Sequence, residues 1–206
     1  MSRERCSGNP LPSGGGAVKR LAIIQIETPW HRLHRSEASI LTPLERTAVT
    51  RRLGALVATP SWVPPNAGPG GRFAEPQGPG VLYLGHDLDT CLAEIIHHHA
   101  RFCAASVGTP PGTRGVFRHL IFTVNATFAD VSKGRTPLHD PVSYAASWAY
   151  ARHVRAASLD GVHYRSVRKQ GGRCLGVFVA PAATFSRVEF GAVVLEWDGS
   201  ASCRIA

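Results

Sequence analysis

The sequence predicts an α+β fold in a single domain, on three observations. Short apolar segments of strand length alternate irregularly with amphipathic segments of helical period, the connecting loops are long, and no internal repeat is evident. With 206 residues, of which 44% are hydrophobic and 18% charged, the chain is typical of one folded domain with a sizeable core. We expect that domain to span residues 19–206, after a Ser/Gly/Pro-rich flexible tail at residues 1–18.

The first predicted strand covers residues 21–26, a continuous apolar run that ends at Thr28-Pro29. An aromatic and basic cluster, residues 30–35, is expected just beyond the end of this strand. Functional side chains are common at such positions, because the strand fixes the backbone while the loop frees the side chain. Arg32 is therefore a candidate site residue, and the alternative is an edge tryptophan flanked by solvated arginines.

A predicted helix and a long loop come next. Periodic Leu and Ala residues predict the helix over residues 43–58. Residues 59–80 are rich in proline and glycine, which predicts a long loop, and ordered loops of this length are usually functional. The apolar run 81–84 then predicts a short buried strand that carries Tyr83.

A second helix is predicted after this strand, with Asp87 or Asp89 as its N-cap. At about 100° per residue, Glu94 lies near the edge of the apolar stripe of this helix. A half-exposed surface glutamate fits the same pattern. The stripe consists of residues three and four positions apart: Leu88, Cys91, Leu92, Ile95, Ile96, His99 and Phe102.

The second half of the chain predicts further strands and one more helix. Asp140-Pro141 is a typical cap and first turn for a helix that ends near Ala157. Its expected core-facing residues are Tyr144, Ala145, Trp148 and Ala151. The predicted strands cover residues 116–124, 162–164 and 175–180, and a terminal hairpin covers residues 186–205. The strand 162–164 ends at Arg165-Ser166.

The charge balance favours an anionic partner. The formal net charge is +9, and only three of the 23 basic residues are lysine. Arginine can grip an oxyanion with two parallel hydrogen bonds, so this bias suits phosphate-bearing ligands. No run of basic residues and no zinc-finger or RNA-recognition signature is present, which argues against direct nucleic-acid binding.

The five cysteines are scattered and contain no CxxC, which argues against a disulfide framework and for a reducing compartment. No apolar run is long enough to span a bilayer, and the first 20 residues lack the apolar segment of a secretory signal. We therefore expect a cytoplasmic protein that does not associate with membranes.

Three candidate site residues lie at equal spacing on three different elements. Arg72 belongs to the loop, Tyr83 to the short strand and Glu94 to the helix that follows. A cation, an aromatic ring and a carboxylate delivered in this way could form one side of a cleft.

These segments resemble the RES domain family, which is named for a characteristic arginine, glutamate and serine. The matching segments run in family order: WHR (30–32), GGRF (70–73), VLYLG (81–85), DTCLAE ending at Glu94, SLDGVHYRS ending at Ser166, and CLGVF (174–178). Together they cover about residues 20–180. Ala74 stands where the family usually has asparagine.

The resemblance implies a fold similar to ADP-ribosyltransferase toxins and NAD+ as the substrate. Characterised members cleave the nicotinamide–ribose bond with inorganic phosphate as co-substrate, which gives nicotinamide and ADP-ribose-1″-phosphate. Many members are toxins paired with an Xre-type antitoxin protein. No metal and no cofactor beyond the substrate is implied, and whether the chain forms a homodimer stays open.

The residue types suit this chemistry. Arg72, together with Arg32, can hold pyrophosphate or phosphate through bidentate bonds. Tyr83 offers a ring for the cationic nicotinamide. Glu94 can stabilise the oxocarbenium character that develops on the ribose. Ser166 is expected to hydrogen-bond a phosphate oxygen or the ribose. The sequence pairs no base with this serine, so we do not expect it to be a nucleophile.

Other functions fit the same residues. Water as acceptor would make the protein an NAD glycohydrolase, and a protein side chain as acceptor would make it an ADP-ribosyltransferase. A non-catalytic module that binds nucleotide or nucleic acid is a further alternative. A metal site at His97, His98, His99 and Cys103 is disfavoured, because consecutive histidines on a helix point in different directions.

Overall fold

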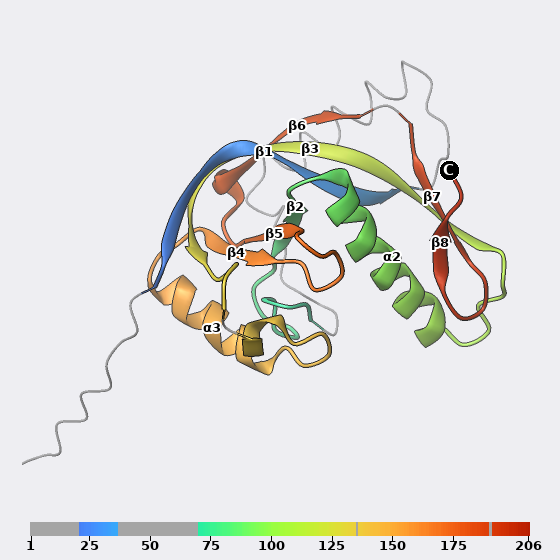
Figure 1. The fold of residues 1–206 in the computed structure, drawn as a ribbon, viewed down its shortest axis with the longest axis horizontal. Helices are drawn as coiled ribbons and strands as arrows, with labels where there is room; N and C mark the ends of the chain where they lie inside the picture. The colour runs from blue at the N-terminus through green and yellow to red at the C-terminus, as the bar shows by residue number, and fades with distance from the viewer. Residues whose placement is uncertain (1–20, 37–69, 135, 190) are drawn as a thin grey trace, which may run out of the picture.

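The structure is a computed structural model that describes residues 21–36, 70–134, 136–189 and 191–206. These residues form one mixed sheet and two α-helices (Figure 1). The elements are β1 (Ile23–Ser36), β2 (Leu82–Gly85), α2 (Leu88–Ala105), β3 (Thr113–Asp130), η2 (Thr136–His139), α3 (Ala145–Ala156), β4 (Gly161–Arg165), β5 (Arg173–Val177), η3 (Ala180–Ala182), β6 (Ala183–Val188), β7 (Val193–Trp197) and β8 (Ser202–Arg204). The predicted α+β fold is confirmed.

The strand order is β1-β2-β5-β4-β3-β7-β8, with β6 also paired to β3. β1 and β3 are antiparallel over 14 residue pairs, so the pairings β1-β2-β5-β4-β3 close into a ring. β3 and β4 are parallel, and the other pairs are antiparallel. Side chains of β3 and β5 form the centre of the core, where Leu120, Phe122, Val124, Leu175 and Val177 are fully buried.

The two helices lie near opposite ends of the arch that β1 and β3 form (Figure 1). α2 packs Cys91, Leu92 and Ile95 on a cluster formed with β1, β3 and β7. α3 packs Ala151 and Val154 against the cluster that includes β4. In this view β2, β4 and β5 lie in the region between the two helices (Figure 1).

Several local predictions are confirmed. β2 and β4 lie within one residue of their predicted bounds, whereas β5 begins two residues before the predicted strand 175–180 and ends three residues before its end. β7 and β8 form a terminal hairpin, but it begins at Val193, because residues 186–188 belong to β6, which pairs with β3. Asp87 is the N-cap of α2, since its carboxylate accepts a hydrogen bond from the Thr90 amide at 2.7 Å. The predicted tail at residues 1–18 and the predicted helix 43–58 lie outside the described residues.

The prediction for β1 is wrong at its end. β1 continues through Thr28-Pro29 to Ser36, so residues 30–35 belong to the strand and not to a loop beyond it. The pairing with β3 outweighs the local turn signal of the proline. Trp30 and Leu33 are buried in this part of β1. The predicted strand 116–124 is likewise only the middle of the longer β3.

The prediction for α3 is wrong at its start and on its buried face. The Asp140 carboxylate accepts hydrogen bonds from the amides of Val142 and Ser143, which closes a separate turn before the helix begins at Ala145. The buried residues of α3 are Ser147, Tyr150, Ala151 and Val154. On α2, Phe102 is 56% exposed and lies under the Arg35 guanidinium, so it does not belong to the core stripe.

Candidate active site

A cavity of about 480 Å³ lies among α2, β2 and the loop that carries Arg72. This volume is in the range of pockets that bind small molecules. Of the five candidate residues from the sequence, Arg32, Arg72, Tyr83 and Glu94 line the cavity. Ser166 does not line it and lies against Glu94 instead.

The loop that carries Arg72 is a tight turn with two glycines at its start. Gly70 has a φ of +89°, a conformation that favours glycine. The amide of Gly71 donates to the Ala74 carbonyl at 2.8 Å. A Cβ on Gly71 would lie 2.8 Å from the Tyr83 hydroxyl oxygen, which is too close for a side chain. Both glycines are therefore required for the loop to approach β2.

Arg72 is 8% exposed and held from one side. Its Nη1 donates to the carbonyls of Leu138 and Asp140, both at 2.9 Å, and its Cζ lies 5.0 Å from the centre of the Tyr144 ring. Within the described part of the chain, Nε and Nη2 have no hydrogen-bond partner. These two nitrogens remain available to an anionic ligand, because a guanidinium has five N–H donors.

Tyr83 has two tasks in this geometry. Its ring lines the cavity, and its hydroxyl oxygen accepts a hydrogen bond from the Phe73 amide at 2.9 Å. Burial raises the pKa of the Tyr83 phenol, so the hydroxyl stays protonated. Tyr83 thus fastens the Arg72 loop to β2 while its ring borders the ligand space.

Glu94 is held by Ser166. The Ser166 hydroxyl donates to Glu94 Oε1 at 2.6 Å, and its oxygen accepts from the amides of Arg168 and Lys169, both at 3.0 Å. A serine hydroxyl has one donor and two acceptor lone pairs, so all three are in use. The serine therefore orients the carboxylate, whereas the sequence suggested a direct contact with phosphate or ribose.

Arg32 projects from β1 and is half-buried at the cavity. Burial lowers the pKa of its guanidinium, with the nearby Cys91 acting in the opposite direction. Arg32 thus reaches the cavity from within a strand and not from a loop.

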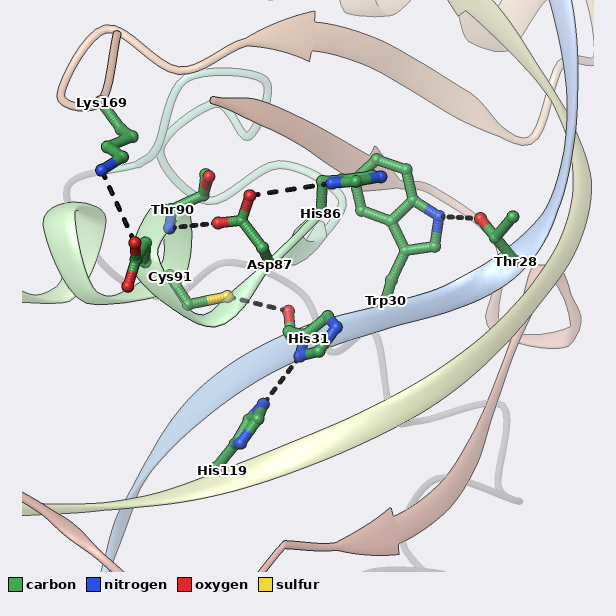
Figure 2. A network of polar contacts seen from close by, with 10 residues as sticks. Thr28, Trp30, His31, His86, Asp87, Thr90, Cys91, His119 and Lys169 are labelled. Carbon is green, nitrogen blue, oxygen red and sulfur yellow. Dashed lines mark hydrogen bonds and ion pairs between the residues drawn. The ribbon is translucent and has the colours of Figure 1, made fainter. Parts of the chain in front are cut away.

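A polar network fixes the start of α2 to β1 (Figure 2). The Cys91 thiol donates to the His31 carbonyl at 3.1 Å, and the ring of His31 is hydrogen-bonded to that of His119 at 2.8 Å. Lys169 lies 3.7 Å from Asp89 in the first turn of the helix. The Cys91 bond thus fixes the first turn of α2, just before Glu94, to β1, the strand that carries Arg32.

Sequence reasoning missed several residues that line the cavity: His97, Tyr144, Tyr164, Arg168 and Cys174. His97 follows Glu94 by three positions, so the helical period could have found it. Burial, reinforced by Arg168, lowers the pKa of His97 to about 4, which keeps this ring neutral. The two tyrosines and Arg168 reach the cavity through tertiary structure, and no sequence signal marks them.

Among residues 21–36, 70–134, 136–189 and 191–206, no cluster of three or more His, Cys, Asp or Glu side chains is arranged to hold a metal ion. His99 Nδ1 is hydrogen-bonded to the Ser202 hydroxyl at 2.8 Å, and its Nε2 lies 3.8 Å from the Cys103 sulfur. His99 does not line the cavity. Neither helix of the described chain is long and apolar enough to cross a membrane.

Comparison with known proteins gives the family and the fold of the chain. The RES domain family model matches residues 43–198, which include Arg72, Tyr83, Glu94 and Ser166, whereas Arg32 precedes the match. The fold is similar to a chain in the crystal structure of the M. tuberculosis MbcT–MbcA toxin–antitoxin complex, with a TM-score of 0.51 and 14% identity over 81% of this chain and 85% of that chain. No curated protein matches the sequence. Because the family model matches well over half of this chain, the chain belongs to the RES domain family.

Proposed function

We propose that this RES domain degrades NAD+ by cleaving the nicotinamide–ribose bond, with inorganic phosphate as the acceptor. One observation carries the proposal: Arg72 and Glu94 line the same cavity. Hydrogen bonds to the protein hold each of the two charged groups and use only some of its nitrogen or oxygen atoms. A dinucleotide with a pyrophosphate and a sugar that becomes cationic in the transition state needs both charges.

In the proposed reaction, a phosphate oxygen forms a bond to the ribose carbon that carries nicotinamide. The carbon–nitrogen bond breaks, and its electron pair leaves with the nicotinamide, which becomes neutral. The products are nicotinamide and ADP-ribose-1″-phosphate. Glu94 stabilises the positive charge that develops on the ribose while the carbon–nitrogen bond breaks and the bond to phosphate forms.

The remaining residues bind and orient. Arg72 and Arg32 attract the phosphate groups, and Nε and Nη2 of Arg72 can form two parallel bonds to them. The ring of Tyr83 borders the same space and can receive the cationic nicotinamide. Ser166 orients Glu94 and is not proposed as a nucleophile, since both lone pairs of its oxygen accept backbone amides and the residue does not line the cavity.

We also propose that the chain acts in the cytoplasm as a toxin that an antitoxin protein restrains. The support is the fold shared with a chain of the MbcT–MbcA toxin–antitoxin complex. Co-purification with the product of a neighbouring antitoxin gene would test this part of the proposal separately from the chemistry.

The activity is tested by incubating the purified protein with NAD+, with and without phosphate, and identifying the products. Phosphate-dependent release of nicotinamide with ADP-ribose-1″-phosphate supports the proposal. Free ADP-ribose in both conditions would instead indicate a glycohydrolase, and ADP-ribose attached to protein would indicate a transferase. Binding of NAD+ without nicotinamide release would mean a non-catalytic module.

A further inference from the structure

We propose that Arg168 is a second phosphate-binding cation of the cavity, which acts opposite Arg72 on the same anionic group of the ligand. This inference rests on the proposed function, because it assigns a further substrate-binding residue to the same site. Arg168 lines the cavity and is half-buried, although it lies outside the motif segments that carry the family resemblance.

The side chain of Arg168 is fixed at one nitrogen. Its Nη2 donates to the Pro141 carbonyl at 2.8 Å. Arg72 is anchored in the same way one residue earlier, since its Nη1 donates to the Asp140 carbonyl at 2.9 Å. Two guanidinium groups therefore bond adjacent carbonyls of one segment, and both residues line the cavity.

The backbone of Arg168 is tied to the catalytic carboxylate. Its amide donates to the Ser166 hydroxyl oxygen at 3.0 Å, and that hydroxyl donates to Glu94. The hydrogen bonds thus run from Glu94 through Ser166 and Arg168 to the segment that holds Arg72. Glu94, Arg168 and Arg72 are therefore positioned relative to one another by a continuous set of contacts around the cavity.

The charge distribution agrees with an anion at this place. Glu94 is the single acidic side chain among the described residues that line the cavity, whereas Arg32, Arg72 and Arg168 are cationic. His98 also lines the cavity, and burial lowers its pKa; Glu94 opposes this shift, whereas Arg101, Arg168 and Arg72 reinforce it. In the proposed reaction Glu94 stabilises the ribose. Arg72 and Arg168 then have no acidic partner among the described lining residues and can bind phosphate oxygens.

A neighbouring arginine provides a matched control. Arg165 is exposed at the end of β4 and does not line the cavity. Substitution of Arg165 removes the same charge within three residues of Arg168 and leaves the cavity intact.

The test is the affinity of the full chain for two probes, ADP-ribose and nicotinamide riboside, measured by calorimetry for wild type, R168Q, R168K and R165Q. We expect R168Q to weaken ADP-ribose binding about tenfold, because charge-assisted bonds to phosphate oxygens are lost, and R168K to weaken it less. R165Q should bind ADP-ribose as wild type does. Nicotinamide riboside carries no phosphate, so R168Q should bind it as well as wild type does.

Two results would overturn the inference: unchanged ADP-ribose affinity in R168Q, or an equal loss of affinity for both probes, which would mean that Arg168 supports the fold and does not contact phosphate. Thermal unfolding of each variant confirms that the compared proteins are folded. Failure of the proposed function looks different, because wild type would then either bind neither ADP-ribose nor NAD+, or bind NAD+ without releasing nicotinamide.

Discussion

The two walls of the cavity are built in different ways. Glu94 stands on α2, a regular helix of 18 residues whose own backbone bonds fix its position, and one side-chain hydrogen bond from Ser166 orients the carboxylate. Arg72 stands on an irregular loop, which has only a few backbone hydrogen bonds of its own. We call these the helix wall and the loop wall.

The loop wall obtains its rigidity from α3. Trp148 Nε1 donates to the Gly71 carbonyl at 2.8 Å, Arg152 forms an ion pair with Glu75, and Arg155 Nη2 donates to the Gly80 carbonyl at 3.1 Å. Residues 148, 152 and 155 are four and three positions apart, so they lie on one face of the helix. One face of α3 thus holds the beginning, middle and end of the loop.

This difference has a functional consequence. On the helix wall, a single side chain can be altered with little effect on the fold, so its loss is expected to reduce the chemistry alone. On the loop wall, each side chain has both a structural and a binding task, so its loss is expected to reduce stability and activity together. The following predictions test this contrast.

The largest effect is expected for E94Q on the helix wall. The substitution keeps the shape of the side chain and removes the charge that, in the proposed reaction, stabilises the ribose cation. We expect kcat/KM for NAD+ cleavage to fall at least about a hundredfold with an unchanged Tm. Near-wild-type turnover in E94Q would remove Glu94 from the mechanism.

R72K on the loop wall is expected to have the second largest effect. Lysine keeps the charge but cannot bond both carbonyls and still present a fork to the ligand. We expect kcat/KM to fall by roughly tenfold to a hundredfold and the Tm to decrease as well. R114K, at an exposed arginine paired with Glu196, is the control and should change neither quantity. A full loss of activity without any change in Tm would contradict the dual task.

S166A tests the single bond of the helix wall. Without the hydroxyl, Glu94 loses its orienting donor and two backbone amides lose their acceptor. We expect kcat to fall about tenfold with little change in KM, since the serine does not line the cavity. S186A, at an exposed serine of β6, is the matched control. A large increase in the KM for phosphate or NAD+ in S166A would indicate direct contact with the ligand.

W148F tests the support of the loop wall from a distance. The variant keeps a large ring but removes the donor to the Gly71 carbonyl. The loss of one hydrogen bond is expected to lower the free energy of unfolding by about 1 kcal/mol. A loosened Arg72 loop should also lower kcat/KM by roughly threefold. If both quantities match wild type, α3 does not position the loop.

The smallest effect is the pH dependence that His97 contributes on the helix wall. Burial lowers the pKa of this ring from 6.5 to about 4 in the folded chain. Between these values the unfolded chain binds a proton that the folded chain does not, so stability decreases as the pH falls through this window. H97Q should therefore lose less stability than wild type between about pH 7 and about pH 5 in urea unfolding, while H153Q, at an exposed histidine of α3, should follow wild type.

The same contrast explains what the sequence could predict. α2, its cap Asp87 and the half-buried position of Glu94 follow from helical period and local capping chemistry, which act within a few residues. The length of β1 does not follow from such local signals, because the pairing with β3 overrides the break that Pro29 suggests. Local signals thus predicted the helix wall and failed where partners are distant in the chain.

The loop wall shows the same limit for the site. The GGRF segment predicted that Arg72 is functional, but nothing in it indicates that Trp148 and the Leu138 carbonyl hold the loop. Ser166 was singled out, yet its bond to Glu94 joins residues 72 positions apart and could not be derived from spacing. Arg168 was missed as a lining residue for the same reason.

The long strand β3 has a consequence for how the molecule opens. It is hydrogen-bonded to β1, β4, β6 and β7, so none of these strands can separate without exposing its amides. Local fluctuations must therefore be confined to the periphery, and the β3 amides should be the slowest to exchange with deuterium. Since most of these partners are remote in sequence, the chain has many long-range contacts to establish before it is native, and we expect it to fold slowly for its size.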